Sequence, residues 1–92
     1  MSRRIRLTDA QIFTLRRIKN GTRHLLRGDE KKGNAVTSTR DIDCSSLPAL
    51  FRKGLIKWHS NVPKDPGTWY WVRLTHSGNI AVDEMKTKAE RE

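Results

Sequence analysis

The chain has 92 residues, of which 35% are hydrophobic, and a net charge of +9 at neutral pH. This apolar content fills one small core, which indicates a single domain. The sequence contains no apolar run near the ~18 residues that a membrane span requires. No apolar stretch follows the first residues, so we expect no secretory signal peptide. A single cysteine, Cys44, excludes an internal disulfide and fits a reducing, cytoplasmic location.

The positive charge is unevenly distributed along the chain. Residues 1–75 contain sixteen basic and six acidic side chains, whereas residues 76–92 contain three basic and four acidic ones. A small domain with this excess of Lys and Arg is a candidate to bind a polyanion, above all nucleic acid. The nearly neutral C-terminal segment is expected to serve packing or solvation instead.

Residues 1–7 are predicted to be a basic N-terminal arm, and residues 8–90 a single domain. The arm contains three arginines, Arg3, Arg4 and Arg6. Such an arm can follow the backbone or the minor groove of DNA, or it can simply be solvated.

A first helix is predicted to begin after Thr8, because Thr8 and Gln11 have the spacing of a capping box. Apolar side chains then repeat at helical spacing at Ile12, Leu15 and Ile18. Asn20-Gly21 is a good helix stop. Leu25 and Leu26 continue the helical phase, so a second short helix at this point remains an alternative.

An exposed loop over residues 27–35 is expected to lead into a short second helix. Ser38 and Asp41 have capping-box spacing, and Ile42 is the main apolar anchor of this predicted helix. A third helix is predicted from Ser45 or Ser46, with Pro48 in its first turn, where a missing N–H costs nothing. Its inward-facing residues are Leu47, Leu50 and Phe51, and Gly54 ends it.

A β-hairpin and a last helix complete the predicted order. The strands are residues 56–62 and 69–74, joined by a Pro- and Gly-rich tip at residues 63–67. Alternation in the second strand places two sets of side chains on opposite faces: Tyr70, Val72 and Leu74 on one, and Trp69, Trp71 and Arg73 on the other. Thr75 is predicted to cap a final helix with an apolar stripe of Ile80, Ala81 and Met85.

This order predicts an α+β, mainly helical fold: a winged helix-turn-helix with three helices, a β-hairpin wing and a C-terminal helix. Two segments carry a resemblance, residues 47–56, ending in Gly-Leu-Ile, and residues 72–78, containing Leu-Thr-His-Ser-Gly. Together they resemble the winged-helix core of the multiple-antibiotic-resistance regulator family. The chain lacks that family's long dimerisation helices and the Asp-Arg pair of its wing tip, so neither its dimer geometry nor its effector pocket is carried over.

In that fold the third helix is the element expected to reach into a DNA groove. Its exposed residues would be Ser45, Ser46, Ala49, Arg52 and Lys53. Ser and Ala can approach base edges, and Arg52 can contact a guanine or a phosphate. A solvated helix face is the alternative interpretation.

Further DNA contacts are expected from the second helix, through Arg40, and from the wing, through Lys57, His59, Lys64 and Arg73. Trp69 and Trp71 are costly to expose, so three interpretations are open for them. They cover part of the core, form a protein interface, or stack on bases. Of these three, we take a protein interface as the predicted role of Trp69 and Trp71.

No residues form a catalytic or metal-binding pattern. The histidines and Cys44 lack the spacing of metal ligands, and no nucleophile elbow, phosphate loop or paired carboxylates occur. We therefore expect no enzyme activity, cofactor or metal.

The function predicted from the sequence is that of a small bacterial or phage regulator of transcription. It would bind double-stranded DNA in a sequence-specific way, associate with the nucleoid and form a weak homodimer through the last helix. The alternatives are a winged-helix protein-interaction module that inhibits a nucleic-acid-handling complex, and an RNA-binding winged helix.

Overall fold

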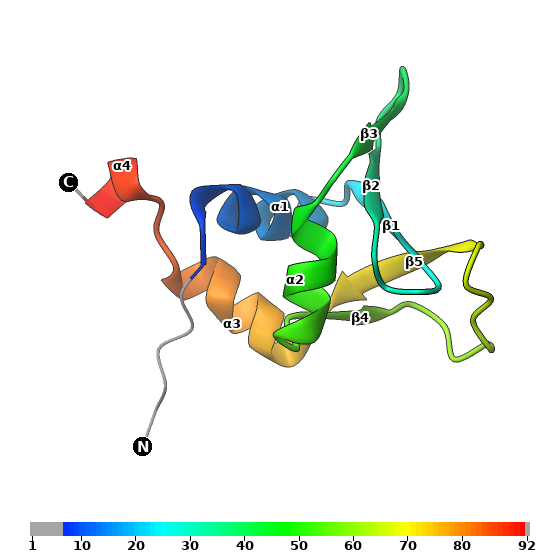
Figure 1. The fold of residues 1–92 in the computed structure, drawn as a ribbon. Coiled ribbons are helices and arrows are strands. Elements are labelled where there is room, and N and C mark those ends of the chain that lie inside the picture. The colour runs from blue at the N-terminus through cyan, green and yellow to red at the C-terminus, as the bar shows by residue number, and fades with distance from the viewer. Residues whose placement is uncertain (1–6, 92) are drawn as a thin grey trace.

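The computed structural model describes residues 7–91. Four helices and five strands follow in chain order (Figure 1): α1 (Asp9–Lys19), β1 (Arg23–Arg27), β2 (Gly33–Val36), β3 (Asp41–Asp43), α2 (Ser46–Arg52), β4 (Ile56–Trp58), β5 (Trp69–Leu74), α3 (His76–Glu84) and α4 (Lys88–Arg91). None of the described helices is long and apolar enough to cross a membrane.

The strands form one five-stranded antiparallel sheet in the order β3-β2-β1-β5-β4. This finding overturns the predicted winged helix-turn-helix, because the described chain is not mainly helical and lacks the layout of three helices followed by a hairpin wing. The predicted hairpin of residues 56–74 exists as β4 and β5. It is, however, one side of a larger sheet and not a separate wing.

Helices α1, α2 and α3 cover one face of the sheet. Contacts join α1 to β5, α2 to both β2 and β4, and α3 to β5. The core lies between these helices and the sheet, and its fully buried members include Leu15, Leu26, Leu47, Leu50, Leu55 and Val72. Leu47 and Leu50 were predicted to face inward from the third helix, and both are buried. No helix formed by residues 7–91 packs on the opposite face of the sheet.

Several local predictions are confirmed at the ends of helices. Thr8 and Gln11 form the reciprocal hydrogen bonds of a capping box at the start of α1. Thr75 caps α3 by accepting a hydrogen bond from the Gly78 amide at 3.0 Å. Gly54 adopts a φ of 74° after α2, a conformation that favours glycine. A Cβ at Gly78 would lie 2.0 Å from the Leu55 carbonyl oxygen, so only glycine permits this approach of α3.

The predicted second helix is wrong, because residues 38–43 belong to the β2–β3 hairpin, which rises away from the rest of the molecule in Figure 1. Ser38 does not cap a helix. Instead Thr37 closes the turn, since its hydroxyl accepts from the Arg40 amide and donates to the Arg40 carbonyl oxygen. β-Branched residues dominate this hairpin at Val36, Thr37, Thr39 and Ile42, which favours a strand over a helix.

The alternative short helix at Leu25 and Leu26 is likewise replaced by a strand, β1. There the two leucines point to opposite faces, with Leu26 buried and Leu25 half-buried. The first strand of the predicted hairpin is shorter than expected, ending at Trp58. The last helix stops at Glu84 and is followed by the separate short helix α4.

Candidate nucleic-acid interface

The structure divides the predicted DNA-binding residues between two faces of the molecule. The residues of the third helix lie on α2, which packs on the helix-covered face of the sheet. The side chains of Lys57 and Arg73 point the other way, because they alternate with the buried Ile56 and Val72. One flat surface therefore cannot engage both predicted groups at once.

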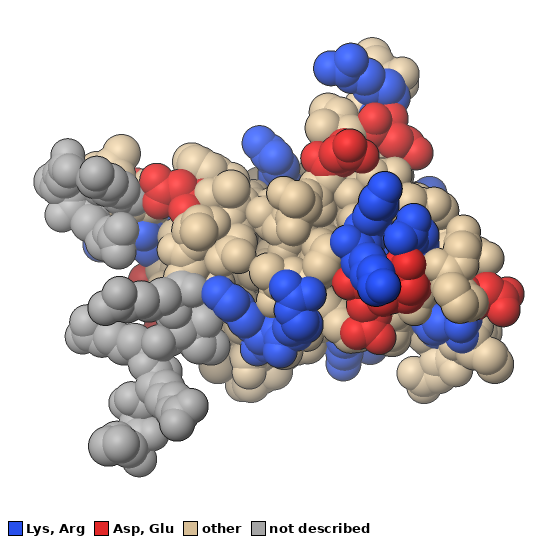
Figure 2. Space-filling model, in the orientation of Figure 1, with Lys and Arg blue, Asp and Glu red and all other residues tan. Residues whose placement is uncertain are grey.

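On the helix-covered side, Arg52 of α2 and the flanking cap residues Ser45 and Lys53 are exposed, whereas Ser46 and Ala49 are half-buried. In the view of Figure 2, Lys and Arg side chains gather over the lower end of α2. A second group lies near the β1–β2 turn, with Asp and Glu beside it. The helix is only seven residues long, which limits its reach into a groove.

The other predicted contacts are scattered. Arg40 lies in the exposed turn of the β2–β3 hairpin and not on a helix. Lys64 lies over the rings of Trp58 and Tyr70, with its ammonium 5.3 and 5.0 Å from their centroids, and donates to the Ser60 and Val62 carbonyl oxygens. It therefore stabilises the hairpin tip. The predicted arm residues Arg3, Arg4 and Arg6 lie outside the described residues.

A group of basic and aromatic side chains gathers on the uncovered face of the sheet, over β1, β5 and the end of β4. We call it the basic sheet face, and it consists of Arg23, Lys57, His59, Trp71 and Arg73, all of them exposed. Lys57 and Arg73 are directly opposite each other across the β4–β5 pair. Their β-carbons are therefore only ~5 Å apart, a separation at which like charges destabilise a sheet.

The centre of the basic sheet face is a stack of three side chains. The His59 imidazole lies parallel to the Trp71 indole, with centroids 4.5 Å apart and planes at 8°. The Arg23 guanidinium lies 4.4 Å from the centroid of the same indole. Because β1 and β4 flank β5 on opposite sides, Arg23 and His59 approach Trp71 from opposite sides. The indole between them is 42% exposed.

Some of the other basic side chains are neutralised by ion pairs. Among the described residues, such pairs join Arg16 to Glu90, Lys19 to Asp83 and Arg27 to Asp29, at 2.6 to 3.0 Å. The hydrogen bond from Arg27 is the main reason why the pKa of the Asp29 carboxyl is lowered. Within residues 7–91, Arg23, Lys57 and Arg73 take part in no ion pair. The basic sheet face therefore presents uncompensated positive charge.

The uncovered face of the sheet carries negative charge at one edge and positive charge at the other. At the β3 edge it carries Asp41 and Asp43, which pair in register with Val36 and Asn34 of β2. The cations lie three and four strands away, on β5 and β4, and Arg23 on β1 lies between the two regions. A polyanion would therefore bind at the β5–β4 side and be repelled from the β3 edge.

The tryptophans do not form one patch. Trp58 is half-buried on the core side. The centroid of its ring lies 5.0 Å from that of Phe51 and 5.8 Å from that of Tyr70. Trp69 is half-buried on the outer side, opposite Arg27 of β1. Only Trp71 is well exposed, and cations surround it. The predicted protein interface of Trp69 and Trp71 is thus a mixed cationic and aromatic surface and not an apolar one.

A hollow of about 230 Å³ opens beside the basic sheet face, between the end of α1 and β5. Trp71, His59 and Arg73 border it on one side, and Thr22 and Asn79 on others. It forms where β1 and β5 separate, since their pairing stops at Leu25 and Trp71.

Sequence reasoning named four of the five members of the basic sheet face but missed Arg23. The reason is that the local sequence does not predict β1. The alternation of His24 and Leu26 with Arg23 and Leu25 is the only local signal of the strand, and its partner Trp71 is nearly fifty positions away in the sequence. The missing information was the pairing of β1 with β5.

Comparison with known proteins adds no relative: no family model matches the chain, and no characterised protein or solved structure is detectably similar to it. The interpretation of this surface is therefore argued from its geometry and charge.

Proposed function

We propose that the protein binds nucleic acid through the basic sheet face. The observation that carries this proposal is the pair Lys57 and Arg73, two cations directly opposite each other on adjacent strands with no ion-pair partner among the described residues. Such a pair costs stability in the free protein. A row of phosphates would remove the repulsion and release counterions from the nucleic acid, which is the main source of affinity in such complexes.

The aromatic part of the face supports the same partner. The Trp71 indole, whose faces are covered by a guanidinium and an imidazole, holds two groups that can be cationic at the surface, where phosphates can reach them. A protein partner is less well matched, because the well-packed centre of protein interfaces is depleted of charged residues.

Sequence-specific binding of duplex DNA is a second candidate, and it would make the protein a regulator of transcription located on the nucleoid. The observation that favours it is the exposure of Ser45, Arg52 and Lys53 on one side of α2. On this proposal the complex would form on the helix-covered face, and the basic sheet face would be left free.

The test is a binding titration with random-sequence duplex and single-stranded DNA at ~50 and ~200 mM salt. The unmodified protein is expected to bind, with a logarithmic affinity that falls as salt rises. The variant Lys57→Gln/Arg73→Gln removes two phosphate contacts. The magnitude of its salt slope should therefore drop by about 1.4–1.8, at 0.7–0.9 for each phosphate.

A matched control distinguishes a local site from net charge. Lys31→Gln/Lys32→Gln removes the same charge from the exposed β1–β2 turn, at the far end of the strands from Lys57 and Arg73. In this control variant, the dependence of the logarithmic affinity on salt should stay nearly as steep as in the unmodified protein. Equal losses in the two double variants would show that the face is not a site, and a loss specific to Arg52→Ala would favour α2 instead.

A further inference from the structure

One member of the basic sheet face, His59, is of a type that can change its charge near neutral pH. A histidine side chain ordinarily gains or loses its proton between pH 5 and 8. The other cations of the face are Arg23, Lys57 and Arg73, and lysine and arginine side chains stay charged throughout that range. The proton on His59 therefore decides how much positive charge the face presents.

The backbone and the ring of His59 are both held against Trp71. The His59 amide donates to the Trp71 carbonyl oxygen at 2.9 Å, and the imidazole lies parallel to the indole with centroids 4.5 Å apart. This stack uses a face of the imidazole and not its edge, and neither ring nitrogen has a hydrogen-bond partner among residues 7–91. Both nitrogens donate when the ring is protonated. An exposed, already positioned ring can therefore donate to a phosphate oxygen.

The charged side chains that β1, β4 and β5 contribute around His59 are all basic. Lys57 lies two positions before His59, and Arg73 lies opposite Lys57 on β5. Arg23 of β1 lies over the Trp71 indole, against which His59 is stacked. The sheet thus supplies no carboxylate that would pair with a protonated His59.

The helices add one cation and one distant carboxylate. Lys19 of α1 and Arg73 border the same hollow as His59. Asp83 of α3 is already paired with Lys19, at 3.0 Å. Within residues 7–91, no carboxylate lines this hollow or forms an ion pair with His59. The charge of a protonated His59 is therefore left for an anion from outside the described chain.

We infer that a protonated His59 contacts a phosphate of the bound nucleic acid, so that binding takes up a proton and strengthens as the pH falls from 8 to 6. A phosphate beside an imidazole favours its charged form. Because linkage between two ligands is reciprocal, the proton raises the affinity for the polyanion by the same factor. This inference rests on the proposed function and adds a regulation of the same site by pH.

The experiment measures the affinity for a short oligothymidylate without terminal phosphates at pH 8 and pH 6, over a range of salt concentrations. The phosphodiester charge of this probe is the same at both pH values. At pH 6 the magnitude of the salt slope of the unmodified protein should be larger by about 0.7, the value for one more phosphate contact on a single strand. The affinity at ~50 mM salt should be about five-fold higher at pH 6 than at pH 8.

Variants at two histidines locate the response. His59→Gln has no charge and should bind equally at the two pH values, whereas His59→Arg is always charged and should show the larger slope at pH 8 as well. His76→Gln alters an exposed histidine at the start of α3 and should keep the full response. Circular dichroism at both pH values checks that the fold is unchanged, because the buried His24 is also titratable.

The possible results separate the inference from the proposed function. A response as large in His59→Gln as in the unmodified protein would assign the proton to another group and overturn the inference. Equal affinities of the unmodified protein at pH 8 and pH 6 would overturn it too, and in both cases phosphate binding would stand. If neither this probe nor random-sequence duplex DNA bound at ~50 mM salt, the proposed function would fall as well.

Discussion

At the scale of single residues, His24 is the most unusual member of the core. Its side chain is fully buried, its Nδ1 lies 3.0 Å from the Thr22 carbonyl oxygen, and its Nε2 has no partner within the described residues. A ring that donates from Nδ1 to a carbonyl and buries an unpaired Nε2 is neutral. Burial lowers the pKa of His24, the nearby charge of Arg17 lowers it further, and the bond to Thr22 opposes both.

The lowered pKa of His24 predicts a stability that depends on pH. Because the unfolded chain takes up this proton near pH 6.5 and the folded chain resists it, the free energy of unfolding should fall as the pH drops from 7.5 to 5. His24→Phe should flatten that dependence, as measured by urea unfolding at the two pH values. His76→Gln alters an exposed histidine and should not. Equal stability of the unmodified protein at both pH values would contradict a neutral, buried His24.

Core packing at Leu50 gives a second prediction at this scale. Leu50 is fully buried where α2 meets the core, so Leu50→Ala should lower the free energy of unfolding by about 2–5 kcal/mol. Arg52→Ala, two positions on and exposed, should change it by no more than about 0.5 kcal/mol. Urea unfolding of both variants measures the contrast, and similar losses would refute the packing of α2.

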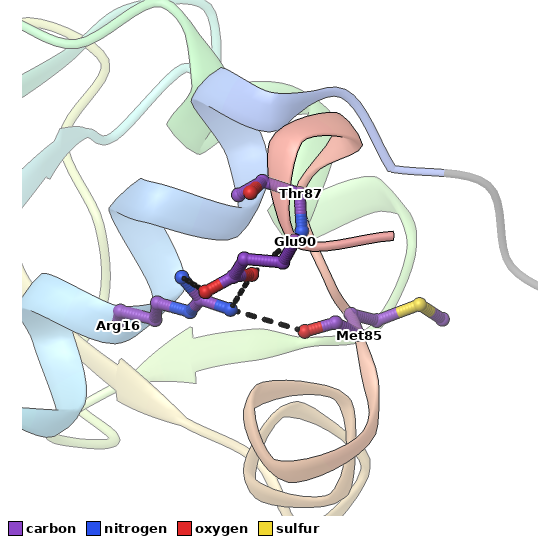
Figure 3. Close-up of polar contacts among 4 residues, drawn as sticks. All are labelled: Arg16, Met85, Thr87 and Glu90. Carbon is purple, nitrogen blue, oxygen red and sulfur yellow. Dashed lines mark hydrogen bonds and ion pairs between the residues drawn. The ribbon is translucent and has the colours of Figure 1, made fainter. Parts of the chain in front are cut away.

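At the scale of elements, α4 is held to α1 by one polar cluster (Figure 3). Arg16 donates two hydrogen bonds to the Glu90 carboxylate, at 2.6 and 3.0 Å, and one to the Met85 carbonyl oxygen. The Thr87 amide also donates to Glu90. Arg16 above all, together with the Thr87 amide, lowers the pKa of Glu90 to about 2. The carboxylate should therefore stay ionised, and α4 docked, until the pH falls well below 4.

Breaking this cluster should release α4 without unfolding the domain. Arg16→Gln is expected to speed hydrogen exchange at the Thr87 and Glu90 amides while the core strands keep their protection. Lys19→Gln removes a different ion pair of α1, with Asp83 of α3, and should leave exchange at α4 unchanged. Unaltered exchange at Thr87 in Arg16→Gln would show that apolar contacts, such as that of Met85 with the core, hold the segment.

The elements also show which parts of the fold the sequence could predict. The capping box at Thr8, the cap at Thr75 and the alternation through β5 are local patterns, and they are confirmed. The Ser38–Asp41 spacing is local too, but it fits a helix start and a hairpin turn equally well. The hydrogen bonds of Thr37 and the pairing of β3 with β2 decided between them.

For the candidate site, the sequence pointed to most of the individual residues but not to the fact that they lie together on one surface. Lys57, His59 and Arg73 were predicted to bind DNA, and Trp71 to form a protein interface, yet they form one surface. These residues come together only through the pairing of β5 with β4 and β1, which joins segments as far apart as residues 23–27 and 69–74. Arg52 and Lys53, predicted to belong with the wing cations, lie on the other side of the sheet because α2 packs against its covered face.

At the scale of the whole molecule, charge is organised by the two faces of the sheet. The helix-covered face holds the core and most of the ion pairs, while the uncovered face carries acidic side chains at the β3 edge and cations on β5 and β4. Helix α3 buries Ala81 and leaves Ile80 exposed, and Met85, which directly follows the helix, packs against the core. Most of the apolar stripe expected to form a homodimer is therefore used within one chain, and the dimer stays a prediction.

The central claim is that nucleic acid contacts the uncovered face of the sheet. The most direct measurement is a map of backbone and side-chain NMR shifts of the unmodified protein during titration with a short oligothymidylate. We predict that the largest changes fall on Arg23, on residues 57–59 and 71–73, and on the indole N–H of Trp71, with Ser45, Arg52 and Lys53 little affected. Changes concentrated on α2, with β5 and the end of β4 unmoved, would contradict the account.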